Sequence, residues 1–259
     1  MADSLRAFLD RLDDPERSLV VHNRSSPEAA RNLLEDLLDN QPVPVHESFD
    51  PDEEVVEEDV VLLVEDGRVL ARSTMDELLS AVLLVNSDLY TTGGRSLSEV
   101  ELPEVLERLD DVPFHVRGYP ESNKEKLLLI TISRVIERTA AEASSGTLRS
   151  SFQRLSRIED ERGTRAVYET VGSRGVDVHV YGIPDRDLEG KLPVTVHGGT
   201  AEEYRRSWFV VYTPDDPTTE RNEHVGLLAL EDEPNVWDGF WTYRDDLVRD
   251  LDAYIRRAL

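Results

Sequence analysis

Arginines gather in one short stretch of a chain that is otherwise strongly acidic. The sequence holds 54 acidic and 29 basic residues, for a formal net charge of −25. Between residues 121 and 165, however, nine bases stand against seven acids. These nine bases are Lys124, Lys126, Arg134, Arg138, Arg149, Arg154, Arg157, Arg162 and Arg165. Because a guanidinium presents paired N–H donors that match carboxylate or phosphate oxygens, the stretch predicts an anion-recognition face.

The same arginines could instead pair with acids inside the protein. The arginines in question are Arg134, Arg138, Arg157 and Arg162. Their possible partners within the same stretch are Glu137, Glu159, Asp160 and Glu161. Such pairs would form across packed helices and would hold no ligand. The sequence leaves both interpretations open.

Six residues are the candidate lining of a ligand pocket. Arg134 and Glu137 share a helix face at a spacing of three, and Gln153 and Arg157 share another at a spacing of four. Tyr181 and Trp241 would add aromatic surface. The aromatic residues near Trp241 have a second explanation, since large aromatic side chains usually fill a hydrophobic core.

Signatures of common enzymes and metal sites are missing from the sequence. It has no phosphate-binding or dinucleotide-binding glycine loop, no G-x-S-x-G and no H-E-x-x-H. There are no cysteines, which excludes disulfides and thiolate chemistry. His179 and His197 lie on neighbouring strand candidates and could face each other, but a third metal ligand is not evident. We therefore expect no catalytic residue and no metal site, and no cofactor is indicated.

The first part of the chain reads as a small α/β module over residues 1–118. Strands are expected at 18–22, 43–46, 60–64 and 69–72, the last two joined through the Asp66-Gly67 hairpin turn. Helices are expected at the N-terminus, after Ser26-Pro27, after the capping box Thr74–Glu77 and at 99–109.

The second part, residues 119–259, starts with a long helix over about 122–143 that carries an apolar seam. Two shorter helices are expected next, one carrying Phe152, Leu155 and Ile158 and one at 161–171. Strands follow at 176–181, 193–197, 207–213 and 224–230, and a helix at 244–258 closes the chain. Strands joined by short turns favour an antiparallel sheet with helices packed on one side, so the predicted fold class is a two-part α+β.

Five stretches of the second part resemble the DICT sensory domain family, and its haloarchaeal members in particular. They are LLLITISRVIE (127–137), GTLRSSFQRLSRIEDERGTRAVYE (146–169), VDVHVYGIPD (176–185), SWFVVY (207–212) and NVWDGFWTY (235–243). The resemblance implies a sensory or signalling role, because the family occurs joined to diguanylate cyclases and two-component proteins. The resemblance does not identify any binding residue in this chain.

The resulting expectation is a non-catalytic sensor that binds a small ligand or a partner protein. That partner would be a signalling protein or a second copy paired through the long helix. The alternative is an enzyme or binder that acts on a nucleotide or phosphorylated metabolite held by the arginines. The acidic net charge argues against nucleic acid and anionic membranes as partners.

Two further features indicate where the protein works. No apolar run approaches the length of a membrane span, and the acidic, amphipathic start of the chain is unlike a signal peptide, so we expect a cytoplasmic protein. The bases comprise 26 arginines and only three lysines, and acids are in large excess. This composition is expected of a halophilic cytoplasm, where molar salt shortens the Debye length to about 3 Å and screens self-repulsion.

We predict that the melting temperature rises with KCl concentration. The carboxylates repel one another at low ionic strength, and this repulsion destabilises the compact state. The check is thermal unfolding followed by circular dichroism from low to molar KCl. A melting temperature that is independent of KCl would contradict the halophilic interpretation.

Overall fold

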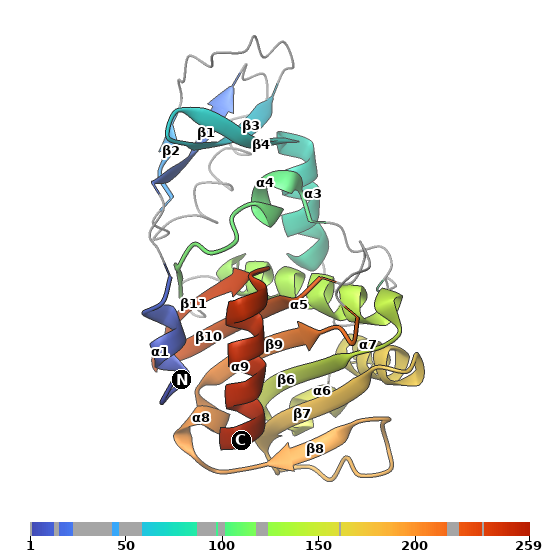
Figure 1. Ribbon diagram of the computed structural model, residues 1–259. Helices are drawn as coiled ribbons and strands as arrows, with labels where there is room; N and C mark the ends of the chain where they lie inside the picture. Colours follow the sequence, from blue (N-terminus) through green and yellow to red (C-terminus); the bar gives the residue numbers. More distant parts are fainter. Residues whose placement is uncertain are drawn as a thin grey trace.

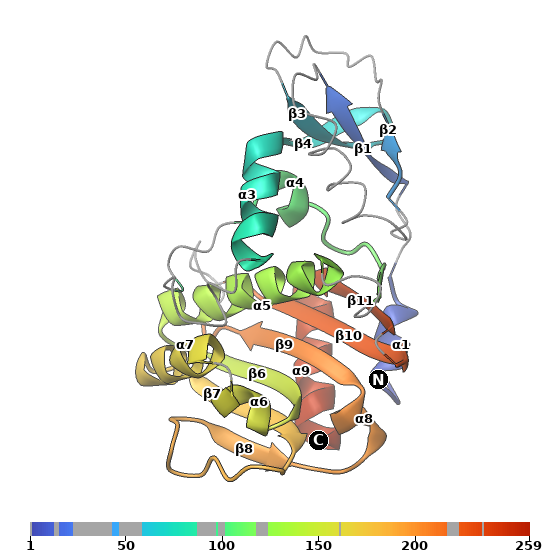
Figure 2. The same ribbon diagram turned by 180° about the vertical axis from the view of Figure 1, so that it is seen from behind.

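The computed structural model describes residues 2–12, 16–22, 43–46, 59–86, 97, 102–117, 124–160, 162–216, 223–234 and 236–259. It contains a four-stranded sheet in the order β2-β1-β3-β4 and a seven-stranded sheet in the order β5-β11-β10-β9-β6-β7-β8. The helix α5 lies between the larger sheet and the helix α3 that accompanies the smaller one (Figures 1 and 2). The predicted helix after Ser26-Pro27 lies outside the described residues.

The smaller sheet is formed by β1 (Arg17–His22), β2 (Val45–His46), β3 (Val60–Glu65) and β4 (Arg68–Thr74). The predicted hairpin between β3 and β4 is confirmed. Asp66 and Gly67 both have positive φ, 50° and 75°, as a two-residue turn between twisted strands requires. The helices α3 (Met75–Asn86) and α4 (Glu104–Glu107) follow, so the helix expected at 99–109 is much shorter among the described residues.

The predicted capping box at the start of α3 is also confirmed. The backbone N–H of Thr74 donates to the Glu77 carboxylate at 2.7 Å, and the backbone N–H of Glu77 donates to the Thr74 hydroxyl at 3.2 Å. Two N–H groups that would otherwise lack a helical partner are thereby satisfied.

The larger sheet is formed by β5 (Phe114–Arg117), β6 (Thr147–Arg154), β7 (Asp177–Ile183), β8 (Thr195–Gly198), β9 (Ser207–Thr213), β10 (Val225–Glu233) and β11 (Val236–Thr242). Its helices are α1 (Arg6–Leu9), α5 (Lys124–Ala143), α6 (Ser156–Asp160), α7 (Arg162–Ser173), α8 (Glu202–Arg205) and α9 (Asp245–Ala258). The α+β class is therefore confirmed, as are the long helix and the closing helix.

The expectation of an antiparallel sheet holds for the pairs β5·β11, β11·β10, β10·β9 and β9·β6, but not for the whole sheet. β6 pairs parallel with β7, and β7 pairs parallel with β8, so the sheet is mixed. The cause is residues 147–154, which form β6 rather than part of a short helix with Phe152. A strand followed by α6, α7 and a second strand is a crossover unit, and such a unit joins parallel strands.

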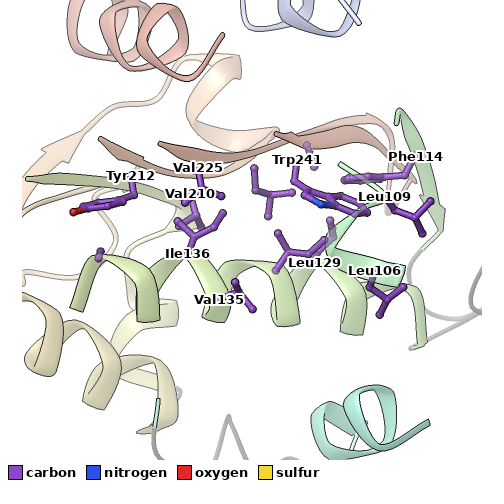
Figure 3. Packing of buried hydrophobic residues seen from close by; sticks show 14 of the residues in the cluster. Leu106, Leu109, Phe114, Leu129, Val135, Ile136, Val210, Tyr212, Val225 and Trp241 are labelled. Carbon is purple, nitrogen blue, oxygen red and sulfur yellow. The ribbon is translucent and has the colours of Figure 1, made fainter. Parts of the chain in front are cut away.

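Helices cover both faces of the larger sheet (Figures 1 and 2), so the expectation that helices pack on one side was wrong. On one face, α9 and α1 enclose a core that includes Leu5, Phe8, Phe209 and Leu251. On the opposite face, Leu129 and Ile136 of α5 point toward the sheet and meet residues such as Val210 (Figure 3). This second core continues into the smaller sheet and α4. The division of the chain at residues 118/119 stays a prediction.

No helix of the described residues combines the length and the apolar character that crossing a membrane requires.

The turn from α5 into β6 depends on a glycine. Gly146 has φ +84°, and a Cβ there would lie 2.4 Å from the carbonyl oxygen of Thr213 and 2.9 Å from Cα of Pro214. Its carbonyl also accepts the backbone N–H of Asp177 at 2.9 Å, which fixes the first parallel pair of β6 and β7.

We predict that Gly146→Ala lowers the free energy of unfolding by about 2–5 kcal/mol, since left-handed backbone strain adds to overpacking. Gly190→Ala is the control, because Gly190 has φ +69° but nothing lies within 4 Å of a Cβ there. Gly190→Ala should lower the free energy of unfolding by only about 1–2 kcal/mol, the cost of placing an alanine in left-handed backbone. Urea unfolding measures both, and equal losses would show that the close approach at Gly146 does not matter.

Candidate functional site

A small cavity opens between α5 and the larger sheet, on the face opposite α9. Its volume is about 110 Å³. α5 contributes Ile130, Ser133, Arg134 and Glu137, β6 contributes Ser151, Phe152 and Gln153, α6 contributes Arg157, α7 contributes Thr164 and Tyr168, and β9 contributes Trp208 and Val210. The structure therefore brings four of the six predicted lining residues to one cavity.

Arg134 and Glu137 form a buried ion pair in the wall of this cavity. They are 5% and 2% exposed, and a guanidinium N–H of Arg134 donates to Glu137 Oε2 at 2.6 Å. Arg134 also donates to the Thr164 hydroxyl at 2.8 Å, and the Tyr168 hydroxyl donates to Glu137 Oε1 at 2.9 Å. The internal-pairing interpretation is therefore right for Arg134. The network joins α5 to α7 and leaves no net charge in this part of the wall.

Tyr168 is held in its neutral form by this network. Burial raises the pKa of its hydroxyl well above the ordinary value, and the neighbouring Glu137 carboxylate raises it further. A protonated phenol can donate to Glu137 but cannot accept a proton at neutral pH.

Gln153 supplies a buried carboxamide at the point where β6 is irregular. The pairing of β6 with β7 shifts register between Ser151 and Arg154, and Gln153 has φ +57°. The residue is 8% exposed, and within the described residues no hydrogen bond of its side chain is found. A non-glycine residue in the left-handed region costs about 1–2 kcal/mol, and such strain gathers at ligand sites. The bulge therefore turns an unpaired amide into the cavity.

Among the described residues that line the cavity, Arg157 is the one charged residue outside the Arg134–Glu137 network. It is exposed and belongs to α6. No carboxylate of the described part of the chain lies within 4 Å of its guanidinium, because Glu159 pairs with Arg165, Arg186 and Lys191 instead. The expectation that Gln153 and Arg157 share one helix face was wrong, since Gln153 lies in β6. Both nevertheless line the same cavity.

Tyr181 and Trp241 do not line this cavity. Tyr181 lies on the α9 face of the sheet, where its hydroxyl accepts from Arg149 at 3.0 Å and its ring stacks on His197 with centroids 4.4 Å apart. Trp241 is buried in the α5 core beside Phe114, with ring centroids 5.9 Å apart (Figure 3). Its neighbours Trp237 and Phe240 are also buried, so the C-terminal aromatic residues form β11 and fill the core.

His179 and His197 do face each other, with Nδ1 of His179 2.9 Å from Nε2 of His197. The other ring nitrogen of His179 lies 3.0 Å from the Asp177 carboxylate. Burial lowers the pKa of His197, and the adjacent His179 lowers it further. Within the described ranges, no three histidine or acidic side chains are grouped as a metal site requires.

A second hollow, of about 450 Å³, has the opposite character. It is lined by Glu104, Glu107, Arg108, Asp110, Glu223, His224, Tyr243 and Asp245. Burial raises the pKa of Asp110, and repulsion from Asp111 raises it further. Five carboxyl groups against one arginine make this hollow unsuited to an anion.

Sequence reasoning missed the residues that close the cavity. Thr164 and Tyr168 lie at a spacing of four on α7, which could have identified a shared face toward α5. Trp208 lies in β9 and donates its indole N–H to Ser133 at 3.2 Å, a contact 75 positions apart in the chain. No local pattern in the sequence indicates that contact.

We predict that Glu137→Gln lowers the free energy of unfolding by about 3–5 kcal/mol, because it removes the carboxylate that pairs with the buried Arg134 guanidinium. Glu169→Gln is the matched control, since Glu169 pairs with Arg165 at 2.9 Å on the exposed face of α7. That change should cost at most about 0.5 kcal/mol. Denaturant titration of both variants is the measurement, and a loss under 1 kcal/mol for Glu137→Gln would contradict the assigned network.

Three comparisons with known proteins bear on this site. Residues 104–220 match the model of the DICT family, described as a sensory domain in diguanylate cyclases and two-component system. A search of the curated proteins finds no match. Among solved structures, a polyphosphate kinase from Porphyromonas gingivalis is similar at a TM-score of 0.38 and 14% identity, over 60% of this chain and 25% of the kinase. A similarity that low supports no argument about function.

The matched range begins at α4 and contains every residue that lines the cavity. The comparison thus supports the resemblance seen in the sequence, since residues 104–220 match the model of this family of sensory domains.

Proposed function

We propose that this protein is a non-catalytic sensor whose signal is a small ligand bound in the α5 cavity. The observation that carries the proposal is Gln153, a buried carboxamide held in strained backbone and aimed into an open cavity. Within the described residues no hydrogen bond to this amide is found, so a ligand or water in the cavity can pair with it. The sensory character of the DICT family supports this function.

The chemistry of the cavity wall favours binding over catalysis. Both carboxylate oxygens of Glu137 accept hydrogen bonds, from Arg134 and Tyr168. The raised pKa of Tyr168 keeps its hydroxyl protonated. A general base must reach the substrate and take its proton, whereas Glu137 is 2% exposed and paired with Arg134, and Tyr168 keeps its own proton.

The alternative function, an enzyme or binder for a nucleotide or phosphorylated metabolite, fits this cavity less well. Sites for drug-sized ligands enclose about 300–1,000 Å³, whereas this cavity measures about 110 Å³. A phosphate group is also usually held by several donors of positive charge. Here Arg134 is committed to Glu137.

α5 gives the sensor a route for its output. One side of α5 lines the cavity through Ser133 and Arg134, and the helix also packs against α3. Its residue Leu129 belongs to the same buried cluster as Met75 and Leu78 of α3. We propose that ligand binding shifts α5 and that the N-terminal part passes this shift to a signalling partner or to a second copy. We place the protein in a salt-rich haloarchaeal cytoplasm, on the strength of its acidic composition.

Filling the cavity tests whether it binds small molecules. Ile130→Trp places a larger side chain at the cavity wall and should fill much of its volume, at a cost of about 1–3 kcal/mol in stability. Ring-sized fragments, including carboxylic acids, amides and phenols, are screened by thermal shift in KCl. We expect some fragments to raise the melting temperature of the unmodified chain and none to raise that of Ile130→Trp.

Leu70→Trp is the matched control, because Leu70 is exposed on β4, away from the cavity. It should respond to fragments as the unmodified chain does. Fragment shifts that persist in Ile130→Trp would overturn the proposed site, as would the absence of any shift in the unmodified chain.

A further inference from the structure

We propose that the ligand of the α5 cavity is a small aromatic monocarboxylate. This inference rests on the proposed function and adds the chemical class of the ligand. Three properties of the wall lead to it: its net charge, the hydrogen-bonding groups it leaves unused and the shape of its apolar part.

The charge of the wall selects a single negative charge. Among the described lining residues the charged ones are Arg134, Glu137 and Arg157. The Arg134–Glu137 contact at 2.6 Å makes a neutral pair, so Arg157 sets the net charge at one positive unit. In molar salt the Debye length is about 3 Å, so the surrounding acids are screened and a ligand responds mainly to the groups that it touches. A monoanion is the complementary ligand.

The unused hydrogen-bonding groups select a carboxylate as that anion. The carboxamide of Gln153 offers two N–H donors, and the guanidinium of Arg157 offers five. A carboxylate has two oxygens in one plane, so one oxygen can accept from each residue. The strained backbone at Gln153 is consistent with this role, because it holds the amide where the ligand must pair with it.

The apolar part of the wall selects a flat ring as the body of the ligand. Phe152 of β6 and Trp208 of β9 supply aromatic surface, and Ile130 and Val210 supply aliphatic surface. The ring of Phe152 makes an edge-to-face contact with the ring of Tyr168, with centroids 5.1 Å apart. Trp208 is held by its hydrogen bond to Ser133. The volume of about 110 Å³ approaches that of cavities that hold benzene, about 150 Å³. A single ring with one carboxylate at the mouth matches this shape.

Benzoate, benzamide and acetate are the probes that test the inference on the full chain. Benzamide has the shape of benzoate without its charge, and acetate has the charge without the ring. Dissociation constants are measured in KCl by calorimetry and by the change in tryptophan fluorescence that a ligand beside Trp208 produces. We expect benzoate to bind at least about tenfold more tightly than benzamide, since it makes a charge-assisted hydrogen bond to Arg157. Acetate should show no binding in the range where benzoate saturates.

Arg157→Gln should weaken benzoate about tenfold or more and remove the preference over benzamide. Arg154→Gln is the matched control, because Arg154 is an exposed arginine three positions earlier that pairs with Asp185 at 3.7 Å and does not line the cavity. It should leave benzoate binding unchanged. Equal losses in the two variants would show a general charge effect and overturn the inference, and acetate binding as tightly as benzoate would overturn the aromatic part.

Ile130→Trp separates failure of this inference from failure of the proposed function. If benzamide binds as tightly as benzoate and Ile130→Trp abolishes both, the ligand class is wrong and the cavity remains a binding site. If benzoate binds to Ile130→Trp as tightly as to the unmodified chain, it binds outside the cavity. That result would overturn the ligand inference and would count against the cavity as the binding site. If neither probe binds the unmodified chain, the carboxylate inference is overturned, while the fragment screen still decides the function.

Discussion

Taking a guanidinium and a carboxylate out of water costs several kcal/mol for each ion, and only close pairing with additional hydrogen bonds offsets that cost. Arg134 and Glu137 meet this condition because Thr164 and Tyr168 add hydrogen bonds to the pair. All four side chains are needed at fixed positions, so α5 and α7 are held at a defined distance over the sheet. This spacing leaves a cavity beside Phe152 and Gln153 that no side chain of the described residues fills.

The crossover from β6 to β7 connects this constraint to the sheet. α7 belongs to that crossover, so it must return over the face that α5 also covers, while α9 closes the other face (Figures 1 and 2). The register shift at the end of β6 then turns Gln153 toward the helices. The same elements that close the fold therefore place an amide, an arginine and two aromatic rings around one hollow.

Local patterns in the sequence were sufficient for much of the fold. The hairpin at Asp66-Gly67, the capping box at Thr74 and the amphipathic closing helix each depend on residues close together in the chain, and each was predicted correctly. β6 was not, because Phe152, Leu155 and Ile158 recur at helical spacing and the buried polar residues of β6 hide the pattern of a strand. Arg149 and Ser151 are buried in β6 only because Asp252 and the backbone of β9 satisfy them. Partners that distant leave no local signal.

The candidate site shows the same division. The excess of arginine in an acidic chain and the spacing of Arg134 and Glu137 indicated the correct helices. The sequence could not show that Arg134 pairs with a carboxylate while Arg157 has none among the described residues, since that depends on which acids the fold brings near each guanidinium. It also could not separate Tyr181 from the cavity, because alternation along β7 places that ring on the opposite face only once the faces are assigned.

A crystal structure of the full chain grown with benzoate in molar KCl tests the central claim most directly. The account predicts density for the ring beside Phe152 and Trp208, its carboxylate on Gln153 and Arg157, and the contact between Arg134 and Glu137 intact. A benzoate carboxylate bound to Arg134, with Glu137 displaced, would contradict it. So would a cavity filled by protein side chains, with benzoate bound elsewhere on the molecule.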